Sequence, residues 1–268
     1  MASARPLLKL VDLSRIEVPY ARGWEWQRRL LQHHMKLQEI KGNALAGHVL
    51  VMQHKSVYTL GSQTEADWLR TFHGEEDAGG NKLVYDTFEV ERGGQATYHG
   101  PGQLVMYPIM DLNFFEKDIN LYLRGLEQTV INVARNYEIE SGRVEGLTGV
   151  WVGDSKISAV GIKLRRWITM HGLSLNVNPD MRYFDKIVPC GINDKAVGSL
   201  SAFNSSATIE RVSKNLIEEF VNVFHVEFVD AIDNGIRNQR SDDRDKCLFE
   251  YLDRIDGLLG LERDYTVS

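Results

Sequence analysis

A cysteine held between a proline and a glycine is the first candidate for chemistry. The chain has two cysteines, and Cys190 stands in the run IVPCGI between Pro189 and Gly191. A thiol at such a turn is reactive when backbone amides or a cation stabilise its thiolate. A lone cysteine is more often a small buried side chain, and Cys247, in KCLFEYL, fits that description. The residue types favour Cys190 as a nucleophile without deciding it.

A glycine-rich stretch at residues 91–108, ERGGQATYHGPGQLVMYP, is the second candidate. Its glycines permit positive φ angles and a close approach of the backbone to a ligand. The same stretch carries these polar side chains: Arg92, Gln95, Thr97, Tyr98 and His99. It has neither the GK[ST] ending of a Walker loop nor GxGxxG spacing, so a nucleotide-phosphate site is not supported. The alternative is an ordinary connection between two strands.

A lysine at the start of a strand is the third candidate. In KISAVGIKL, alternation places Lys156 on the same side as Val160 and Ile162. A lysine on an apolar side would be desolvated and suited to acid–base work. The alternative is a solvated lysine at a strand end.

The basic group formed by Lys163, Arg165 and Arg166 has two interpretations. It is either a docking patch or a charged strand edge that discourages aggregation. The net charge is −6 and the pI about 5.8, so general binding to nucleic acid or to an anionic membrane is not expected. No run approaches the length of a membrane span, and no secretory signal is apparent. Two cysteines without a CxxC pair predict reduced thiols and no zinc site.

Helices and strands that would position these residues alternate along the chain. Helical periodicity predicts helices over residues 23–42, over 119–137 after the cap Asp118, and over 209–224 after the cap Thr208. Apolar runs predict strands at 48–53 and 103–110 and three antiparallel strands between 148 and 177, with a Gly153-Asp154 turn. The fold class is therefore α+β, a mixed or antiparallel sheet covered by helices.

Four motifs in this order resemble the lipoyl(octanoyl) transferases. They are RGGQATYHGPGQL, KISAVGI, RRWITMHGLSLNV and IVPCGI, and the resemblance extends over roughly residues 45–200. ERGGQATYHGPGQLVMYP and GLTGVWVG are most similar to plastid and cyanobacterial members. The resemblance implies the catalytic-domain fold of biotin and lipoate protein ligases. We expect a catalytic domain over residues 1–230 and a charged C-terminal extension over 231–268.

The resemblance also implies roles for residues. Cys190 would form an acyl-enzyme thioester, and Lys156 would pair with it. The segments Arg92–His99, Ala159–Gly161 and Gly172–Ser174 would line the acyl pocket. The full set of implied substrate-binding residues is Arg92, Gly93, Gly94, Gln95, Ala96, Thr97, Tyr98, His99, Ala159, Val160, Gly161, Gly172, Leu173 and Ser174. His99 and His171 would either assist by hydrogen bonding or be structural.

The implied reaction is octanoyl transfer in the lipoate pathway, without cofactor or metal. The implied donor is octanoyl-acyl carrier protein. The implied acceptors are the lipoyl domains of 2-oxoacid dehydrogenase E2 subunits and the glycine cleavage H protein, with no nucleic-acid or membrane partner. We expect a soluble intracellular protein of a bacterial cytoplasm, or of a plastid or mitochondrial matrix.

Small departures from the family pattern affect the expected pocket. Lys55 and Ser56 stand where many members have a proline, Ser174 replaces a common alanine, and Met170 replaces a frequent aromatic residue. They leave the reaction class unchanged and bear on chain-length preference. Three alternatives remain open: an ATP-dependent lipoate–protein ligase, a cysteine hydrolase using His99 or His171, and a non-catalytic acyl-binding module.

Overall fold

The computed structural model describes residues 4–64, 86–187, 196–231 and 241–254. Its helices and strands in chain order are β1 (Leu7–Val18), α1 (Tyr20–Leu37), β2 (Leu45–His54), β3 (Val57–Leu60), β4 (Thr87–Glu89), β5 (Thr97–His99), β6 (Gln103–Met110), η2 (Leu112–Phe114), α2 (Ile119–Arg135), β7 (Gly142–Val144), β8 (Leu147–Val152), β9 (Ser155–Arg165), β10 (Ile168–Asn176), η3 (Met181–Lys186), β11 (Ala196–Val197), α3 (Leu200–Phe203), α4 (Ile209–Phe224), β12 (Glu227–Asp230) and α5 (Ser241–Asp253). The described strands form a mixed nine-stranded sheet and a small three-stranded sheet.

The main sheet has the order β12-β1-β2-β6-β10-β9-β8-β7, and β11 pairs with β9. β1 runs parallel to β2 and β12, whereas β2, β6, β10, β9, β8 and β7 are successively antiparallel. This confirms the α+β class and the three antiparallel strands after residue 147. Sequence periodicity missed β1 and β12, which are stabilised by partners distant in the chain.

Helix capping follows the sequence closely. The Asp118 carboxylate accepts hydrogen bonds from two backbone N–H groups at the start of α2, and Thr208 accepts one at the start of α4. The expected boundaries of α1 were wrong. It begins at Tyr20, because Pro19 accepts the first backbone hydrogen bonds without having to donate one, and it ends at Leu37.

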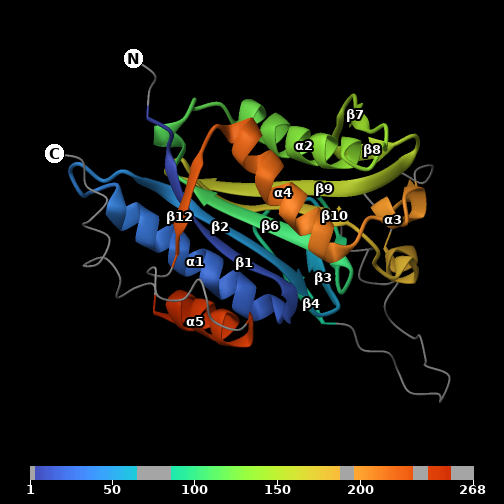
Figure 1. Ribbon diagram of the computed structural model, residues 1–268, viewed down its shortest axis with the longest axis horizontal. Coiled ribbons are helices and arrows are strands. Elements are labelled where there is room, and N and C mark those ends of the chain that lie inside the picture. Colours follow the sequence, from blue (N-terminus) through green and yellow to red (C-terminus); the bar gives the residue numbers. More distant parts are fainter. Residues whose placement is uncertain (1–3, 65–85, 188–195, 232–240, 255–268) are drawn as a thin grey trace.

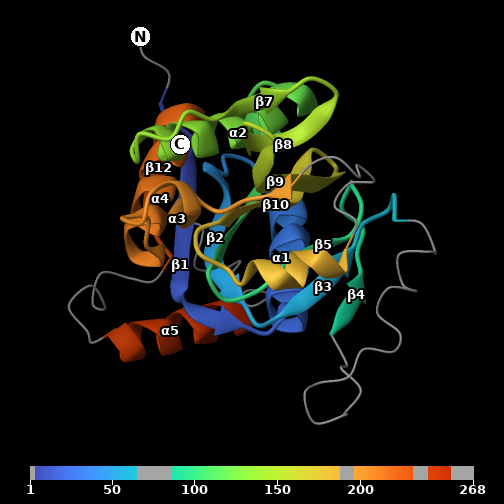
Figure 2. The same ribbon diagram turned by 90° about the vertical axis from the view of Figure 1, so that its right-hand side faces the viewer.

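Helices cover both faces of the main sheet (Figure 1). α2 and α4 pack on one face over a core that includes Val51, Met106 and Leu173. α1 packs on the other face against Met52 and Tyr107. The small sheet β4-β3-β5 lies beside α1, as Figure 2 shows. The site described below lies where that small sheet approaches β9 and β10.

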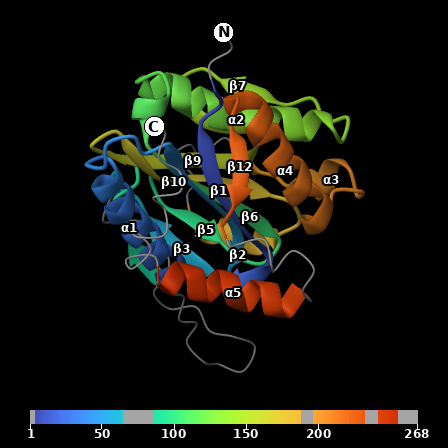
Figure 3. The same cartoon turned by 60° about the vertical axis from the view of Figure 1, so that its left-hand side comes forward.

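α5 packs on the α1 side of the sheet, opposite α2 and α4 (Figure 3). Leu248 and Leu252 are buried there, and Asp253 accepts hydrogen bonds from the Trp26 indole (2.8 Å) and the Arg22 guanidinium (2.6 Å). Cys247 is half-buried on this helix rather than fully buried. The division at residue 230 stays a prediction.

Candidate active site

A cavity of about 250 Å³ opens between β9, β10 and the segment 91–97. It is lined by Tyr20, Gln63, Arg92, Gly93, Gly94, Gln95, Ala96, Thr97, His99, Gln103, Tyr107, Gly146, Leu147, Thr148, Trp151, Lys156, Ser158, Ala159, Val160, Gly161, His171, Gly172, Leu173, Ser174, Asn176, Phe184, Ile187 and Val197. Apolar and aromatic side chains line the cavity together with a similar number of polar side chains.

Arg92 holds the 91–97 segment in shape from within. Its guanidinium donates to the Thr59 carbonyl and hydroxyl (2.8 Å each) and to the Gln95 carbonyl (2.8 Å). These bonds join the segment to β3, so Arg92 both lines the cavity and braces its wall. Several N–H donors in one plane are needed to reach these acceptors together. Arginine provides them, whereas the single ammonium group of lysine does not.

Gly161 allows the segment to lie directly against β9. The Gly93 N–H donates to the Ile162 carbonyl (3.1 Å), and a Cβ at position 161 would lie 2.9 Å from the Gly93 carbonyl oxygen. A side chain would therefore push the two walls of the cavity apart. This contact explains why the segments expected around Arg92 and around Gly161 meet, although they are distant in the sequence.

Lys156 lies at the beginning of β9 and is 9% exposed. Its ammonium is 5.3 Å from the centre of the Trp151 ring, within the range of a cation–π contact. The side chain lines the cavity, so of the two interpretations of this lysine the structure supports the buried one and not the solvated strand end. Cys190 lies outside the described residues. Ile187 and Val197, described residues on either side of that segment, both line the cavity.

His99 is held in place by neighbouring groups. Its Nδ1 donates to the Gln103 side-chain carbonyl (2.7 Å), whose amide in turn donates to Asn176 (2.9 Å). Burial lowers the pKa of His99 well below its usual value. The ring is stacked on Tyr20, with 6.0 Å between ring centres. These contacts favour a structural role for His99 at the polar end of the cavity.

His171 has a left-handed backbone, with φ 62°, at the point where β10 passes the cavity. Its backbone N–H donates to the Gln27 side-chain carbonyl (2.8 Å). Its Nε2 lies 3.8 Å from Glu91 Oε2, longer than a hydrogen bond, and burial lowers the pKa of the ring. A strained residue on a cavity wall is held there by its surroundings.

Thirteen of the fourteen expected substrate-binding residues line the cavity, and Tyr98 does not. Strand alternation in β5 turns Tyr98 away from Thr97 and His99, and its ring stacks on Tyr183 with 4.7 Å between ring centres. Its hydroxyl contacts Ser56 (3.0 Å). The placement of Tyr98 in the pocket was wrong, while binding roles for the others stay predictions.

Of the departures considered above, Ser174 alone lines the cavity. Met170 packs beneath α1, and Ser56 contacts Tyr98 outside the cavity. Lys163 pairs with Glu91 and Arg166 with Glu39 (3.6 Å each). These pairs leave the docking and strand-edge interpretations of the basic group open.

Sequence reasoning missed the wall formed by the β7–β8 hairpin. Gly146, Leu147, Thr148 and Trp151 line the cavity next to Lys156. The phrase GLTGVWVG contained these residues, but its composition alone pointed only to a strand. Tyr20 and Tyr107 were also missed, because their contribution depends on how α1 and β6 cross.

No group of three or more metal-ligating side chains occurs within the described residues. In the same residues, no helix has the length and apolar character needed to cross a membrane.

This chain is similar to many curated proteins and solved structures, of which three relatives and two structures are described. The lipoyl protein ligase A/B catalytic domain model matches residues 19–221. An octanoyltransferase of Nostoc punctiforme is 42% identical, covering 80% of this chain and 88% of its own. One of Synechocystis sp. is 39% identical (84% and 93%), and a chloroplastic one of Arabidopsis thaliana is 37% identical (81% and 78%).

The two structures share the fold at low identity. A lipoate-protein ligase A bound with ATP has a TM-score of 0.59 at 16% identity, covering 94% of this chain and 95% of that one. A bipartite lipoate protein ligase of Thermoplasma acidophilum, described with its E2 lipoyl domain, has a TM-score of 0.58 at 16% identity, covering 98% of each. These matches confirm the expected lipoate-ligase fold.

Proposed function

Because this chain belongs to the lipoyl(octanoyl) transferase family, a family of acyltransferases built on the lipoyl protein ligase catalytic domain, we propose that it transfers an octanoyl group from octanoyl-acyl carrier protein to a lysine of a lipoyl domain. The carrier of the acyl group on the enzyme is Cys190. The observation that carries the proposal is the burial of Lys156 on the wall of a cavity bounded by the RGGQAT segment.

The reaction has two half-reactions. In the first, the Cys190 thiolate attacks the carbonyl of the donor thioester, a new C–S bond forms, and the carrier thiolate leaves. Exchange of one thioester for another is nearly isoenergetic, so ATP is not needed. In the second, the acceptor amine attacks the enzyme thioester, an amide forms, and the Cys190 thiolate is released.

Lys156 supports both halves. As an ammonium it favours the thiolate of a nearby cysteine. The departing carrier thiolate takes the ammonium proton, and Lys156, now an amine, accepts the proton that the acceptor lysine loses when the amide forms. Backbone N–H groups of the glycine-containing walls are the natural donors for the oxyanion of each tetrahedral intermediate.

The acyl chain occupies the cavity between the 91–97 segment, Ala159–Gly161 and Gly172–Ser174. Gly161 lets the 91–97 segment lie against β9, and Gly172 lets β10 lie close to Met106 of β6. The acceptors in this proposal are lipoyl domains of E2 subunits and the glycine cleavage H protein. The Thermoplasma ligase described with its E2 lipoyl domain supports an acceptor of this kind.

Intact-protein mass spectrometry tests the cycle. We expect one octanoyl adduct on Cys190 after incubation with octanoyl-acyl carrier protein alone, and its loss when a lipoyl domain is added. Cys190→Ser should abolish the adduct, while the matched variant Cys247→Ser should retain it. Modification of the lipoyl domain only when lipoate and ATP are supplied would assign the chain to the ligases. Release of free octanoate without an acceptor would indicate a hydrolase.

A further inference from the structure

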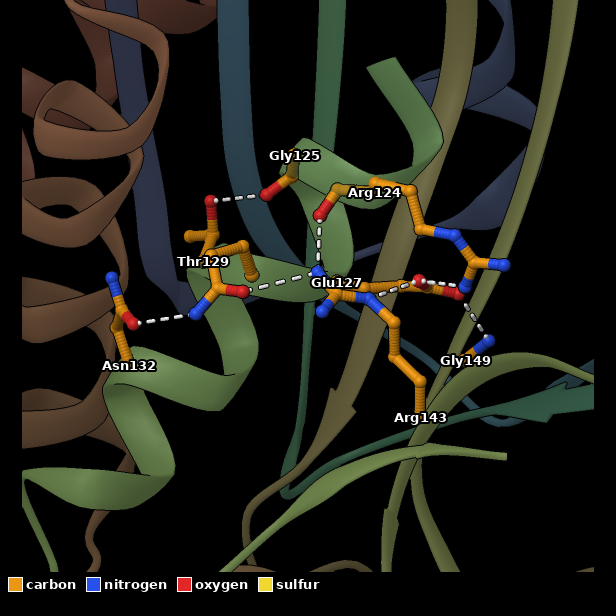
Figure 4. A network of polar contacts seen from close by, with 8 residues as sticks. Arg124, Gly125, Glu127, Thr129, Asn132, Arg143 and Gly149 are labelled. Carbon is orange, nitrogen blue, oxygen red and sulfur yellow. Dashed lines mark hydrogen bonds and ion pairs between the residues drawn. The ribbon is translucent and has the colours of Figure 1, made fainter. Parts of the chain in front are cut away.

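A buried carboxylate on α2 joins this helix to the β7–β8 hairpin. Glu127 is 1% exposed, and its Oε2 accepts from Arg124 Nη1 (2.7 Å) and Arg143 Nε (2.9 Å). Its Oε1 accepts from the backbone N–H of Gly149 (3.0 Å). Figure 4 shows Arg124, Arg143 and Gly149 converging on Glu127 from three sides. The carboxylate therefore joins α2 to both strands of the hairpin, to β7 through Arg143 and to β8 through the backbone of Gly149.

Gly149 connects this network to Lys156. Its φ is +121°, and a Cβ at this position would lie 2.4 Å from the Ser158 carbonyl oxygen and 2.6 Å from Lys156 Cε. The Lys156 side chain thus occupies the space that a side chain at position 149 would take. The register of β8 against β9 shifts between Val150 and Trp151, next to Gly149. The Gly149 N–H that donates to Glu127 therefore lies in the part of the β8 backbone against which the Lys156 side chain packs.

Arg143 fixes the other strand of the hairpin. Its Nη2 donates to the Arg124 carbonyl (2.8 Å) and to the Gln128 side chain (3.1 Å). β7 lies at the edge of the sheet, where backbone pairing on one side alone leaves a strand loosely held. Gly146, Leu147 and Thr148, between the two anchored points, line the cavity. The bonds made by Glu127 and Arg143 therefore fix the position of this part of the cavity wall.

A purely structural ion pair is a weak explanation for this arrangement. The desolvation penalty of the buried Glu127 carboxylate offsets its attraction to two partly exposed arginines, so these ion pairs contribute little net stability. Two arginines donate to one carboxylate oxygen, whereas the other oxygen accepts from a single backbone N–H, that of Gly149. The effect of that bond is to fix the position of the Gly149 backbone.

We propose that Glu127 is a positioning residue, which sets the β8 backbone around Lys156 and so places the Lys156 ammonium at the cavity. The inference rests on the proposed function for its consequence in catalysis, but the position of Lys156 can be measured without it.

Competitive acetylation of the full chain, followed by peptide mass spectrometry over a pH series, reports the reactivity of Lys156 directly. Glu127→Ala should raise the labelling of Lys156, because the wall that covers it loses its bonds to α2. Glu127→Gln retains an oxygen for the Gly149 N–H and should restore most of the protected pattern. Glu219→Ala is the matched control, since Glu219 bridges α4 to Asn132 of α2 away from the cavity.

The rate of lipoyl-domain acylation by preformed acyl-enzyme provides the second readout. Glu127→Ala should lower this rate on the order of 100-fold, as expected for a displacement of about 1 Å, and Arg143→Ala should lower it without adding to the effect of Glu127→Ala. Unchanged Lys156 labelling in Glu127→Ala would overturn the proposal. If the wild-type chain forms no acyl-enzyme, the proposed function fails, and the labelling result still decides the role of Glu127.

Discussion

Lys156 and Trp151 are register partners across β9 and β8, and the ammonium lies 5.3 Å from the centre of the indole ring. The ring also lines the cavity. It therefore limits the directions in which the lysine can point, and it stabilises the charged form by its negative face. This contact and the walls around it lead to the following predictions.

Replacing Trp151 should slow acyl transfer in proportion to the loss of the ring face. Cation–π contacts contribute about 0.5–2 kcal/mol, so Trp151→Leu should lower the acylation rate of the lipoyl domain between about 2-fold and about 30-fold. Trp151→Phe retains an aromatic face and should lose less. Single-turnover rates measure this difference, and equal rates in the two variants would show that the aromatic ring face does not contribute to acyl transfer.

Gly161→Ala should separate the 91–97 segment from β9. The added Cβ would meet the Gly93 carbonyl oxygen at 2.9 Å, which a backbone can relieve only by moving. We expect a higher KM for octanoyl-acyl carrier protein with a small change in melting temperature. Gly142→Ala is the control, because a Cβ there meets nothing within 4 Å. A normal KM for Gly161→Ala would mean that the acyl group does not use this wall.

Arg92→Lys should weaken the same segment from the other side. The guanidinium bonds to Thr59 and Gln95 cannot all be made by an ammonium. Buried acceptors left unpaired cost about 1–3 kcal/mol, so thermal unfolding should occur at a lower temperature and adduct formation should slow. Retention of both properties would show that the segment is held by its backbone contacts alone.

Acid should destabilise the fold through buried histidines. Burial lowers the pKa of His54 to about 4, against 6.5 for an exposed histidine, and lowers the pKa of His48 and His99 in the same direction. The unfolded chain then binds more protons than the folded one between pH 6.5 and 4, so stability falls as the pH falls through this window.

Melting temperatures measured across that window check this expectation. His54→Asn should flatten the decline below pH 6.5, at the cost of lower stability at neutral pH from the altered contacts to Val18 and Tyr107. His225→Asn is the control, because His225 is exposed and asparagine tolerates its left-handed φ of 52°. A decline equally steep in His54→Asn would assign the acid sensitivity to other groups.

The sequence alone determined the three longest helices, five strands of the main sheet and half of the residues that line the cavity. Caps at Asp118 and Thr208 define helix starts by accepting hydrogen bonds from backbone N–H groups two or three residues further on, and alternation in KISAVGIKL placed Lys156 on the side of Val160 and Ile162. Motif order indicated the family and the cavity residues from Arg92 to Ser174. Each of these predictions depends on short-range periodicity or on the identity of particular residues.

Only the tertiary structure decided how distant segments meet. Tyr98 turns away from the cavity because β5 pairs with β3 in a register that its three residues do not encode. The hairpin wall at Gly146–Trp151 and the bond from Glu127 to Gly149 join residues that local patterns treat separately. From the sequence, Glu127 is one more carboxylate on a helix, three residues from Arg124, since its burial and its bonds to Arg143 and Gly149 arise only when α2 packs on the sheet.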